Sequence, residues 1–130
     1  YIEIMANTGP DDKAGELADK DFHRAVASAS GNAAITYVIE TLWSLRTDLE
    51  PVKAVYESVC GADFGARAPE HAAILDALRA HDPAAARVAM RKHFTRLLKS
   101  MLDVTEQRAL EELRKQASKS RQRYLKSATL

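Results

Sequence analysis

The sequence contains little of what disulfide-rich or irregular folds require. Its 130 residues include a single cysteine, Cys60, which rules out a fold held together by internal disulfide bonds. We expect Cys60 to be a small buried or loop thiol, as free cysteines usually are. Only four prolines and five glycines occur, and they fall between periodic apolar segments. These residues therefore mark the ends of regular elements.

Excess charge and long apolar runs are also absent. Nineteen Lys and Arg residues face 18 Asp and Glu residues, so the formal net charge is only +1 and gives the chain no electrostatic attraction to nucleic acid. No run approaches the roughly 18 apolar residues of a membrane span, and no signal peptide is visible. We expect a cytoplasmic chain without membrane contact. Because it begins at Tyr1 rather than at Met, we expect a fragment of a longer protein.

Helical periodicity dominates what is present. Val and Ile never alternate with polar residues for long enough to indicate strands, so the sequence predicts an all-α antiparallel helical bundle. We expect one helix over about residues 12–29. A second helix should begin at about residue 33 and kink or end at Pro51, with a further turn or two continuing to Val59. A loop should follow over residues 61–68. The bundle should span residues 1–102. A modestly basic helical extension should follow over residues 103–130.

A helical hairpin over residues 70–94 is the most informative segment. Pro69 suits the first position of its first helix, and Asp82 followed by proline suits the N-terminus of its second. His71 and His93 lie 11 residues before and after Asp82, each in an apolar stripe. They should therefore face each other across the hairpin. His81 should lie exposed at the turn. A lone histidine in an apolar stripe is usually a core residue, but two histidines at the same height on adjacent helices favour a pair of metal ligands.

A second segment supplies a carboxylate. Asp19 and His23 are four residues apart and share one face of a predicted helix. A carboxylate that points into a core needs a partner for its charge, and a divalent cation is one such partner. Zinc, nickel, manganese, cobalt or iron(II) would suit a site of Asp19, His23, His71 and His93. Two alternatives remain open: Asp21 faces inward instead, or Asp19 and His23 form a surface pair.

Two motifs resemble those of a known family. They are DKDFHRAVASASGN over residues 19–32 and EHAAILDALRAHDPAAARVAMRKHF over residues 70–94. Between about Leu17 and Leu102 the chain resembles the FCD domain, the effector-binding domain of FadR-subfamily GntR transcriptional regulators. The resemblance implies an antiparallel helical bundle that binds a divalent metal through one Asp and three His at the base of a pocket. The matching positions are Asp19, His23, His71 and His93.

The resemblance further implies a sensor for a small carboxylate effector, coupled to an N-terminal winged helix-turn-helix that binds DNA. That DNA-binding domain and most of the first bundle helix are missing from this sequence, so DNA contact should occur only through the missing domain. Arg46 is a candidate effector contact, because a guanidinium pairs with a carboxylate in a bidentate manner; a solvent-facing helix position is its alternative. Asn32 is a second candidate, although an N-cap role for the next helix is favoured.

Three classes of function compete. We expect a homodimeric, non-enzymatic sensor domain of a transcription regulator. A metal-dependent helical-bundle enzyme resembling the DinB-like transferases is the alternative, but no residue near the histidines stands out as a general base or nucleophile. A dimerisation bundle without a ligand is the third reading. Bound metal would exclude that third reading, and metal-dependent turnover would favour the enzyme.

Overall fold

The computed structural model describes residues 1–9, 12–62 and 64–128, and for residues 60–62 and 64 it describes the backbone alone. Within these ranges every regular element is an α-helix, which confirms the predicted fold class. The prediction for the Cys60 thiol lies outside the described side chains. The elements are α1 (Ile2–Asn7), α2 (Lys13–Ser28), α3 (Ala33–Asp48), α4 (Glu50–Ala62), α5 (Phe64–Arg79) and α6 (Pro83–Ser127).

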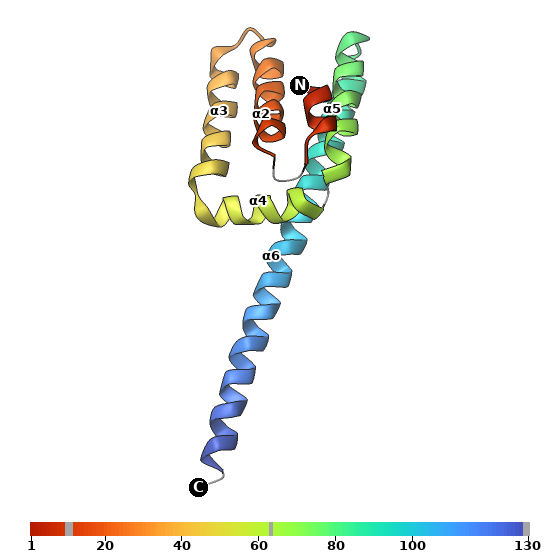
Figure 1. The fold of residues 1–130 in the computed structure, drawn as a ribbon. Helices are drawn as coiled ribbons and strands as arrows, with labels where there is room; N and C mark the ends of the chain where they lie inside the picture. The colour runs from red at the N-terminus through yellow and green to blue at the C-terminus, as the bar shows by residue number, and fades with distance from the viewer. Residues whose placement is uncertain (10–11, 63, 129–130) are drawn as a thin grey trace.

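The helices form a small antiparallel bundle with one long projection (Figure 1). Helices α2 and α3 lie side by side, α1 packs on α2 and α5, and α5 pairs with the first part of α6. Helix α4 crosses the base of the bundle and links α3 to the hairpin. Helix α6 continues past α4 and leaves the bundle. No helix in the described part of the chain is long and apolar enough to cross a bilayer.

Polar side chains fix where the helices begin. The Asp12 carboxylate accepts a hydrogen bond from the Ala14 amide at 2.8 Å and caps α2. Gly31, which follows α2, has φ of 68°, the left-handed conformation that commonly closes a helix. Asn32 Oδ1 then accepts a hydrogen bond from the Ala34 amide at 3.0 Å. The turn between α2 and α3 is thus set by local chemistry alone.

The α5–α6 turn follows the same logic. Asp82 Oδ1 accepts hydrogen bonds from the Ala84 and Ala85 amides at 3.0 and 2.9 Å, with Pro83 in the first turn. His81 has φ of 52°, a left-handed conformation that closes the end of α5, and its side chain is exposed. The predicted break at about residues 80–83 is therefore confirmed.

Two predicted boundaries are wrong. Residues 64–68 belong to α5 rather than to a loop, and Pro69 lies inside that helix instead of opening it. Proline at this position removes one intrahelical hydrogen bond, and packing of Arg67 and Ala68 against the bundle outweighs that loss. Helix α3 ends at Asp48, and Pro51 lies in the first turn of α4, where its missing amide costs little.

The apolar core lies between α1, α2 and α5. Met5, Ala18, Phe22 and Ile74 are buried at its centre, and Met5 and Ile74 are each only 1% exposed. The Phe22 ring contacts the His71 ring edge-on, with centroids 4.8 Å apart. The core therefore supports the histidines from one side.

Candidate metal centre and its pocket

Three histidines from three helices converge beside the core. His23 comes from α2, His71 from α5 and His93 from α6, and one ring nitrogen of each lies within 4.8 Å of the others. The centroids of His71 and His93 are 4.7 Å apart, so the two hairpin histidines face each other. His71 is 0% exposed. Such a cluster, removed from water, has the donor type and spacing of a metal centre.

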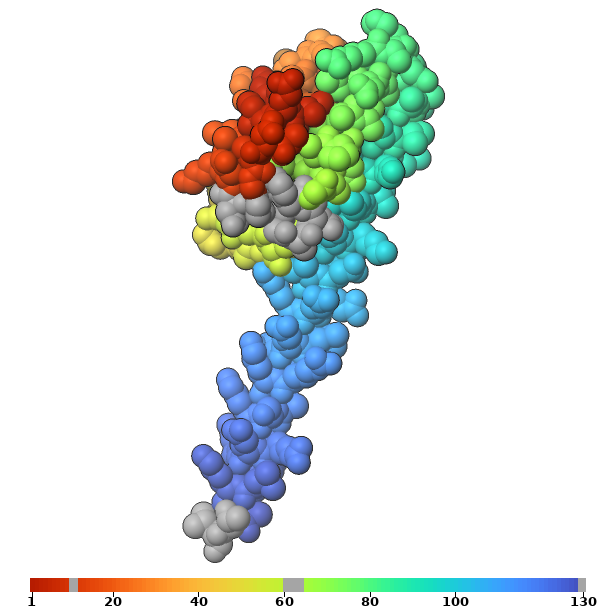
Figure 2. All heavy atoms as spheres, turned by 45° about the vertical axis from the view of Figure 1, so that its right-hand side comes forward, coloured from red at the N-terminus to blue at the C-terminus, as the bar shows by residue number. Residues whose placement is uncertain are grey.

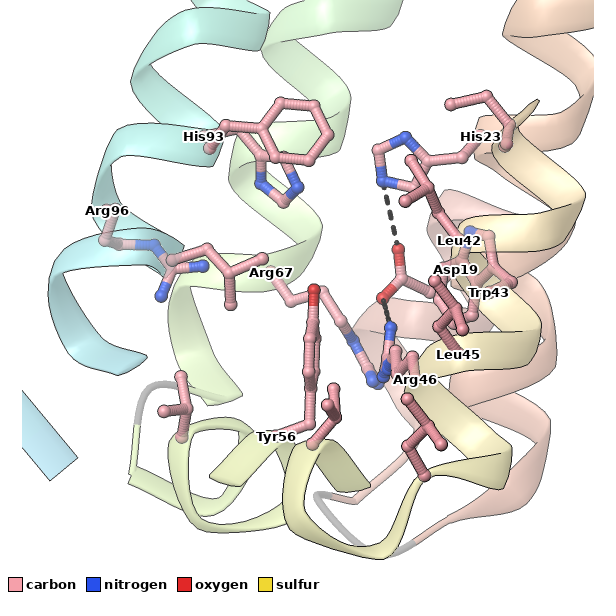
Figure 3. Close-up of a pocket in the computed structure, with 16 residues that line it drawn as sticks. Asp19, His23, Leu42, Trp43, Leu45, Arg46, Tyr56, Arg67, His93 and Arg96 are labelled. Carbon is pink, nitrogen blue, oxygen red and sulfur yellow. Dashed lines mark ion pairs between the residues drawn. The ribbon is translucent and has the colours of Figure 1, made fainter. Parts of the chain in front are cut away.

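Asp19 lies against two of these three rings. Its Oδ1 atom lies 2.9 Å from His71 Nε2 and 3.4 Å from His23 Nε2. Figure 3 shows the carboxylate between His23 above and Arg46 below. Asp19 is 7% exposed, whereas Asp21, the alternative candidate, is only half-buried. The structure thus gathers His23, His71 and His93 and places Asp19 beside the first two of them.

Hydrogen bonds fix the protonated nitrogen of two rings. His71 Nδ1 lies 2.7 Å from the Arg67 carbonyl oxygen, which can only accept, so Nδ1 carries the proton and donates. His93 Nδ1 lies 2.8 Å from Glu70 Oε2 and donates to that carboxylate in the same way. In the neutral rings, Nε2 of both histidines is therefore left with a lone pair. This orientation by an outer oxygen is the usual arrangement around metal-binding histidines.

The lone pairs leave Oδ1 of Asp19 without a hydrogen-bond donor in the described part of the chain. His71 Nε2 lies 3.2 Å from His23 Nε2, and both face the same carboxylate oxygen. Oδ1 of Asp19 is buried and has no hydrogen-bond donor of suitable geometry among the described residues. A buried anionic oxygen facing ring nitrogens requires a proton or a cation between them. The residues present therefore fit a divalent cation.

The charges of the site match this assignment. Burial raises the pKa of Asp19, but the close approach of the His23 and His71 rings lowers it by more, so the carboxyl is held ionised. Burial lowers the pKa of His93 more than its contact with Glu70 raises it, which favours the neutral ring. An ionised carboxylate and a neutral imidazole are the forms that bind metal.

Glu70 is held by a second partner. Its carboxylate accepts two hydrogen bonds from Arg96, from Nε at 2.6 Å and from Nη2 at 2.9 Å, and its side chain is 13% exposed. Burial raises the pKa of Glu70, and the bonds from Arg96 and His93 lower it further than burial raises it. The His93 ring is therefore oriented by a charged, anchored carboxylate.

A pocket of about 400 Å³ opens directly beside the cluster. Asp19, His23 and His93 contribute to its wall, so a metal ion held there would face the pocket. Its remaining polar lining consists of Arg46, Arg67 and Arg96, with Tyr56 alongside (Figure 3). The rest of the lining is largely apolar: Ile39, Leu42, Trp43, Leu45, Leu49, Val52, Val59, Phe94 and Leu97.

Arg46 points into this pocket rather than into solvent. Its Nη1 atom lies 3.6 Å from Asp19 Oδ2, and its side chain is 12% exposed. The guanidinium carbon lies 4.1 Å from the ring centroids of both Trp43 and Tyr56. Aromatic contacts of this kind hold the guanidinium plane in one orientation.

The Arg67 side chain is buried, and the space that it occupies depends on Gly15. It is 8% exposed, and its Nη2 atom donates to Thr8 Oγ1 at 3.3 Å. A Cβ atom on Gly15 would collide with both the Arg67 guanidinium and the Thr8 side chain. Gly15 in α2 therefore makes the room in which the Arg67 side chain lies.

The other sequence candidates lie elsewhere. Asn32 is exposed, caps α3, and is not among the described residues that line the pocket. His81 is exposed at the hairpin turn. Sequence reasoning missed Glu70 and Arg96, although Glu70 begins the second motif and Arg96 follows His93 by three residues on one helix face.

Comparison with known proteins identifies the family. The model of the FCD domain matches residues 2–96. Three curated relatives are each 33% identical over 75 residues, namely the Exu regulon transcriptional regulators of Escherichia coli K12, Escherichia coli O157:H7 and Shigella flexneri. The match covers 58% of this chain but 29% of each relative, so the chain spans less than a third of their length. No solved structure gave a significant match. The predicted resemblance is confirmed: the chain belongs to the FCD domain family.

Proposed function

We propose that this chain is the ligand-sensing domain of a bacterial transcription regulator. Its family and the names of its relatives support a regulator rather than an enzyme. DNA binding would come from a separate winged-helix domain of the whole protein, which would be a cytoplasmic homodimer. The sensing domain would bind a small organic acid and change how that DNA-binding domain engages its operator.

The proposed sensor contains a divalent metal ion. Asp19, His23, His71 and His93 would hold zinc, nickel or manganese, and the observation that carries this is the buried Asp19 Oδ1 atom facing ring nitrogens without a hydrogen-bond donor. The bound ion would supply a Lewis-acidic position at the wall of the pocket. Four protein ligands leave positions open in an octahedral site, so we expect a coordination number above four.

The pocket favours an anionic ligand of modest size. Three arginines line a volume of about 400 Å³, and the Arg46 guanidinium carbon lies 4.1 Å from the centroids of two aromatic rings. A guanidinium in this position matches a carboxylate, while the apolar wall suits a short carbon chain. Hydroxy acids, keto acids, dicarboxylates and sugar acids all fit this description. One carboxylate oxygen would occupy an open metal position.

A thermal-shift screen tests the proposal. The chain is prepared with zinc, nickel or manganese and, separately, stripped with chelator; each form is heated with a panel of these acids and with the matching amides as uncharged controls. We expect an acid to raise the melting temperature of the metal form only, equivalent to about 2.7 kcal/mol at a hundredfold excess over its Kd.

Two results would contradict the proposal. Equal shifts with and without metal would show that the acid does not bind through the ion. Absence of bound metal after incubation with all three ions, together with no change in melting temperature, would remove the metal itself. Metal-dependent turnover of a substrate would instead support the enzyme alternative.

A further inference from the structure

The last part of α6 projects beyond the bundle. Every residue from Thr105 to Ala128 is exposed, and Figure 2 shows this segment standing clear of the other helices. Neither glycine nor proline occurs between Ala84 and Ala128, so the sequence itself favours a continuous helix. In proteins most helical stability comes from packing of one face against another element, which makes the surface pattern of this segment informative.

An apolar stripe runs along this projecting segment. Leu102, Leu113 and Tyr124 follow one another at intervals of 11 residues, which is about three helical turns. Ala109 and Ala117 lie on the same stripe, four residues before and after Leu113. Leu102 and Leu113 are each 61% exposed, and Tyr124 is 72% exposed. The stripe is therefore symmetrical in sequence about Leu113 and uncovered along its length.

The stripe faces away from the bundle. Met101 and Val104 are half-buried on the side toward α4, and Arg108 Nη2 donates to the Ala54 carbonyl oxygen at 2.9 Å. At roughly 100° per residue, the stripe through Leu102 and Leu113 lies about 150° around the helix from that side. A second helix could therefore cover the stripe without meeting α4.

Charge is divided between the two halves of the segment. Residues 103–113 contain four carboxylates and one guanidinium: Asp103, Glu106, Glu111, Glu112 and Arg108. Residues 114–127 contain no carboxylate and six cations: Arg114, Lys115, Lys119, Arg121, Arg123 and Lys126. An antiparallel copy would place each acidic half beside a basic half. A parallel copy would place like charges together along the whole length.

We propose that the projecting part of α6 pairs antiparallel with the same segment of a second copy of this chain. Leu113 would meet Leu113 at the two-fold axis, Ala109 would meet Ala117, and Leu102 would meet Tyr124. The same patch is used by both partners, as a two-fold dimer requires. This deepens the proposed homodimer by naming its interface. The tests involve neither metal nor acid, so their failure is distinguishable from failure of the sensor.

Sedimentation velocity over a range of concentrations tests the interface. We expect the chain to be dimeric and Leu113→Glu to raise the dimer dissociation constant at least about tenfold, because two carboxylates would face each other at the axis. Gln122→Glu adds the same charge on the opposite face and should leave the dissociation constant within about threefold. Leu113 is 61% exposed, so the fold should survive. A monomeric wild-type chain, or a dimer unaffected by Leu113→Glu, overturns the proposal.

Disulfide trapping tests the orientation in a Cys60→Ser background. Antiparallel pairing places Ala109 against Ala117 of the other copy, while the two copies of Ala109 lie about 12 Å apart along the axis, too far for a disulfide. A mixture of Ala109→Cys and Ala117→Cys chains should therefore form the mixed disulfide, and Ala109→Cys alone should not cross-link. Cross-linking of Ala109→Cys with itself would indicate parallel pairing and overturn the proposal.

Charge reversal supplies a rescue experiment. Glu106→Lys with Glu112→Lys makes both halves basic, and Arg114→Glu with Arg121→Glu makes the basic half more acidic. Each double variant should dimerise more weakly than the wild type, whereas a mixture of the two should recover a heterodimer. Failure of the mixture to associate would contradict the charge argument. A chain that stays monomeric but binds duplex DNA through its basic half would overturn the proposal as well.

Discussion

Replacing Glu70 with glutamine should weaken metal binding without removing any proposed ligand. Glu70 accepts three short hydrogen bonds in the structure, one from His93 Nδ1 at 2.8 Å and two from Arg96 at 2.6 and 2.9 Å. Glutamine has nearly the same shape but only one oxygen. Its NH₂ group must take the place either of Oε1, where it faces Arg96 Nε, or of Oε2, where it faces both His93 Nδ1 and Arg96 Nη2, and arginine has only donors to offer.

The second orientation of the glutamine amide changes the metal site directly, through His93. If the new NH₂ group faces His93 Nδ1, that nitrogen must accept, and the proton moves to Nε2, the lone-pair nitrogen of the metal-binding form. In the first orientation the glutamine NH₂ group and Arg96 Nε–H are both donors, so the hydrogen bond that anchors Arg96 is lost. Loss of an outer partner of a metal-binding histidine typically reduces metal affinity by about 10 to 100-fold, or roughly 1.4 to 2.7 kcal/mol. We expect Glu70→Gln to fall in that range.

A competition titration against a zinc-binding dye measures the effect, with the melting temperature of the metal-free variant as a check on folding. Asp76→Asn is the matched control, because Asp76 is exposed and pairs only weakly with Arg79 at 3.9 Å. That control should remain within about threefold of the wild-type affinity. If Glu70→Gln also binds zinc with wild-type affinity, the argument from the His93 tautomer is wrong.

Four further predictions follow from the same geometry. His81→Ala should leave zinc affinity within about threefold, whereas His93→Ala should reduce it by more than about tenfold; equal losses would mean that the cluster is misassigned. Acidification should release the metal, because protonated imidazoles cannot ligate, and since burial lowers the pKa of His93 a titration should place release below the ordinary histidine value of 6.5. Arg46→Lys keeps the charge but loses the planar fork, so calorimetry should show acid binding weakened about tenfold with metal affinity unchanged. Asn32→Ala should lower the free energy of unfolding in urea by about 1 kcal/mol and leave acid binding unaltered; weaker acid binding would restore Asn32 as an effector contact.

Local chemistry made much of the fold predictable. Helical periodicity identified the all-α class, and the capping residues Asn32 and Asp82 fixed two helix starts within a residue. The hairpin prediction rested on counting from Asp82, which placed His71 and His93 at one height, and their ring centroids lie 4.7 Å apart. These features depend on short stretches of sequence, so no knowledge of distant contacts was needed.

What sequence reasoning missed depends on distant contacts. Tyr56 stacks on Arg46 only because α4 turns across the base of the bundle, and no periodic pattern predicts that direction. The pairing of Glu70 with Arg96 joins two helices across the hairpin, beside the histidines that the sequence predicts as ligands. The start of α5 was predicted wrongly at Pro69, because the local preference of proline for the first turn of a helix was outweighed by tertiary packing.

The crowding of Gly15 against Arg67 and Thr8 couples two positions that lie far apart in sequence. A side chain at residue 15 would force the Arg67 guanidinium and the Thr8 side chain to shift, because its Cβ atom would overlap the volume that they now fill. Among related chains, a bulkier residue at the position of Gly15 should coincide with a shorter or uncharged residue at the position of Arg67. Exchange of this pair would alter the electric field inside the pocket while leaving every proposed metal ligand unchanged.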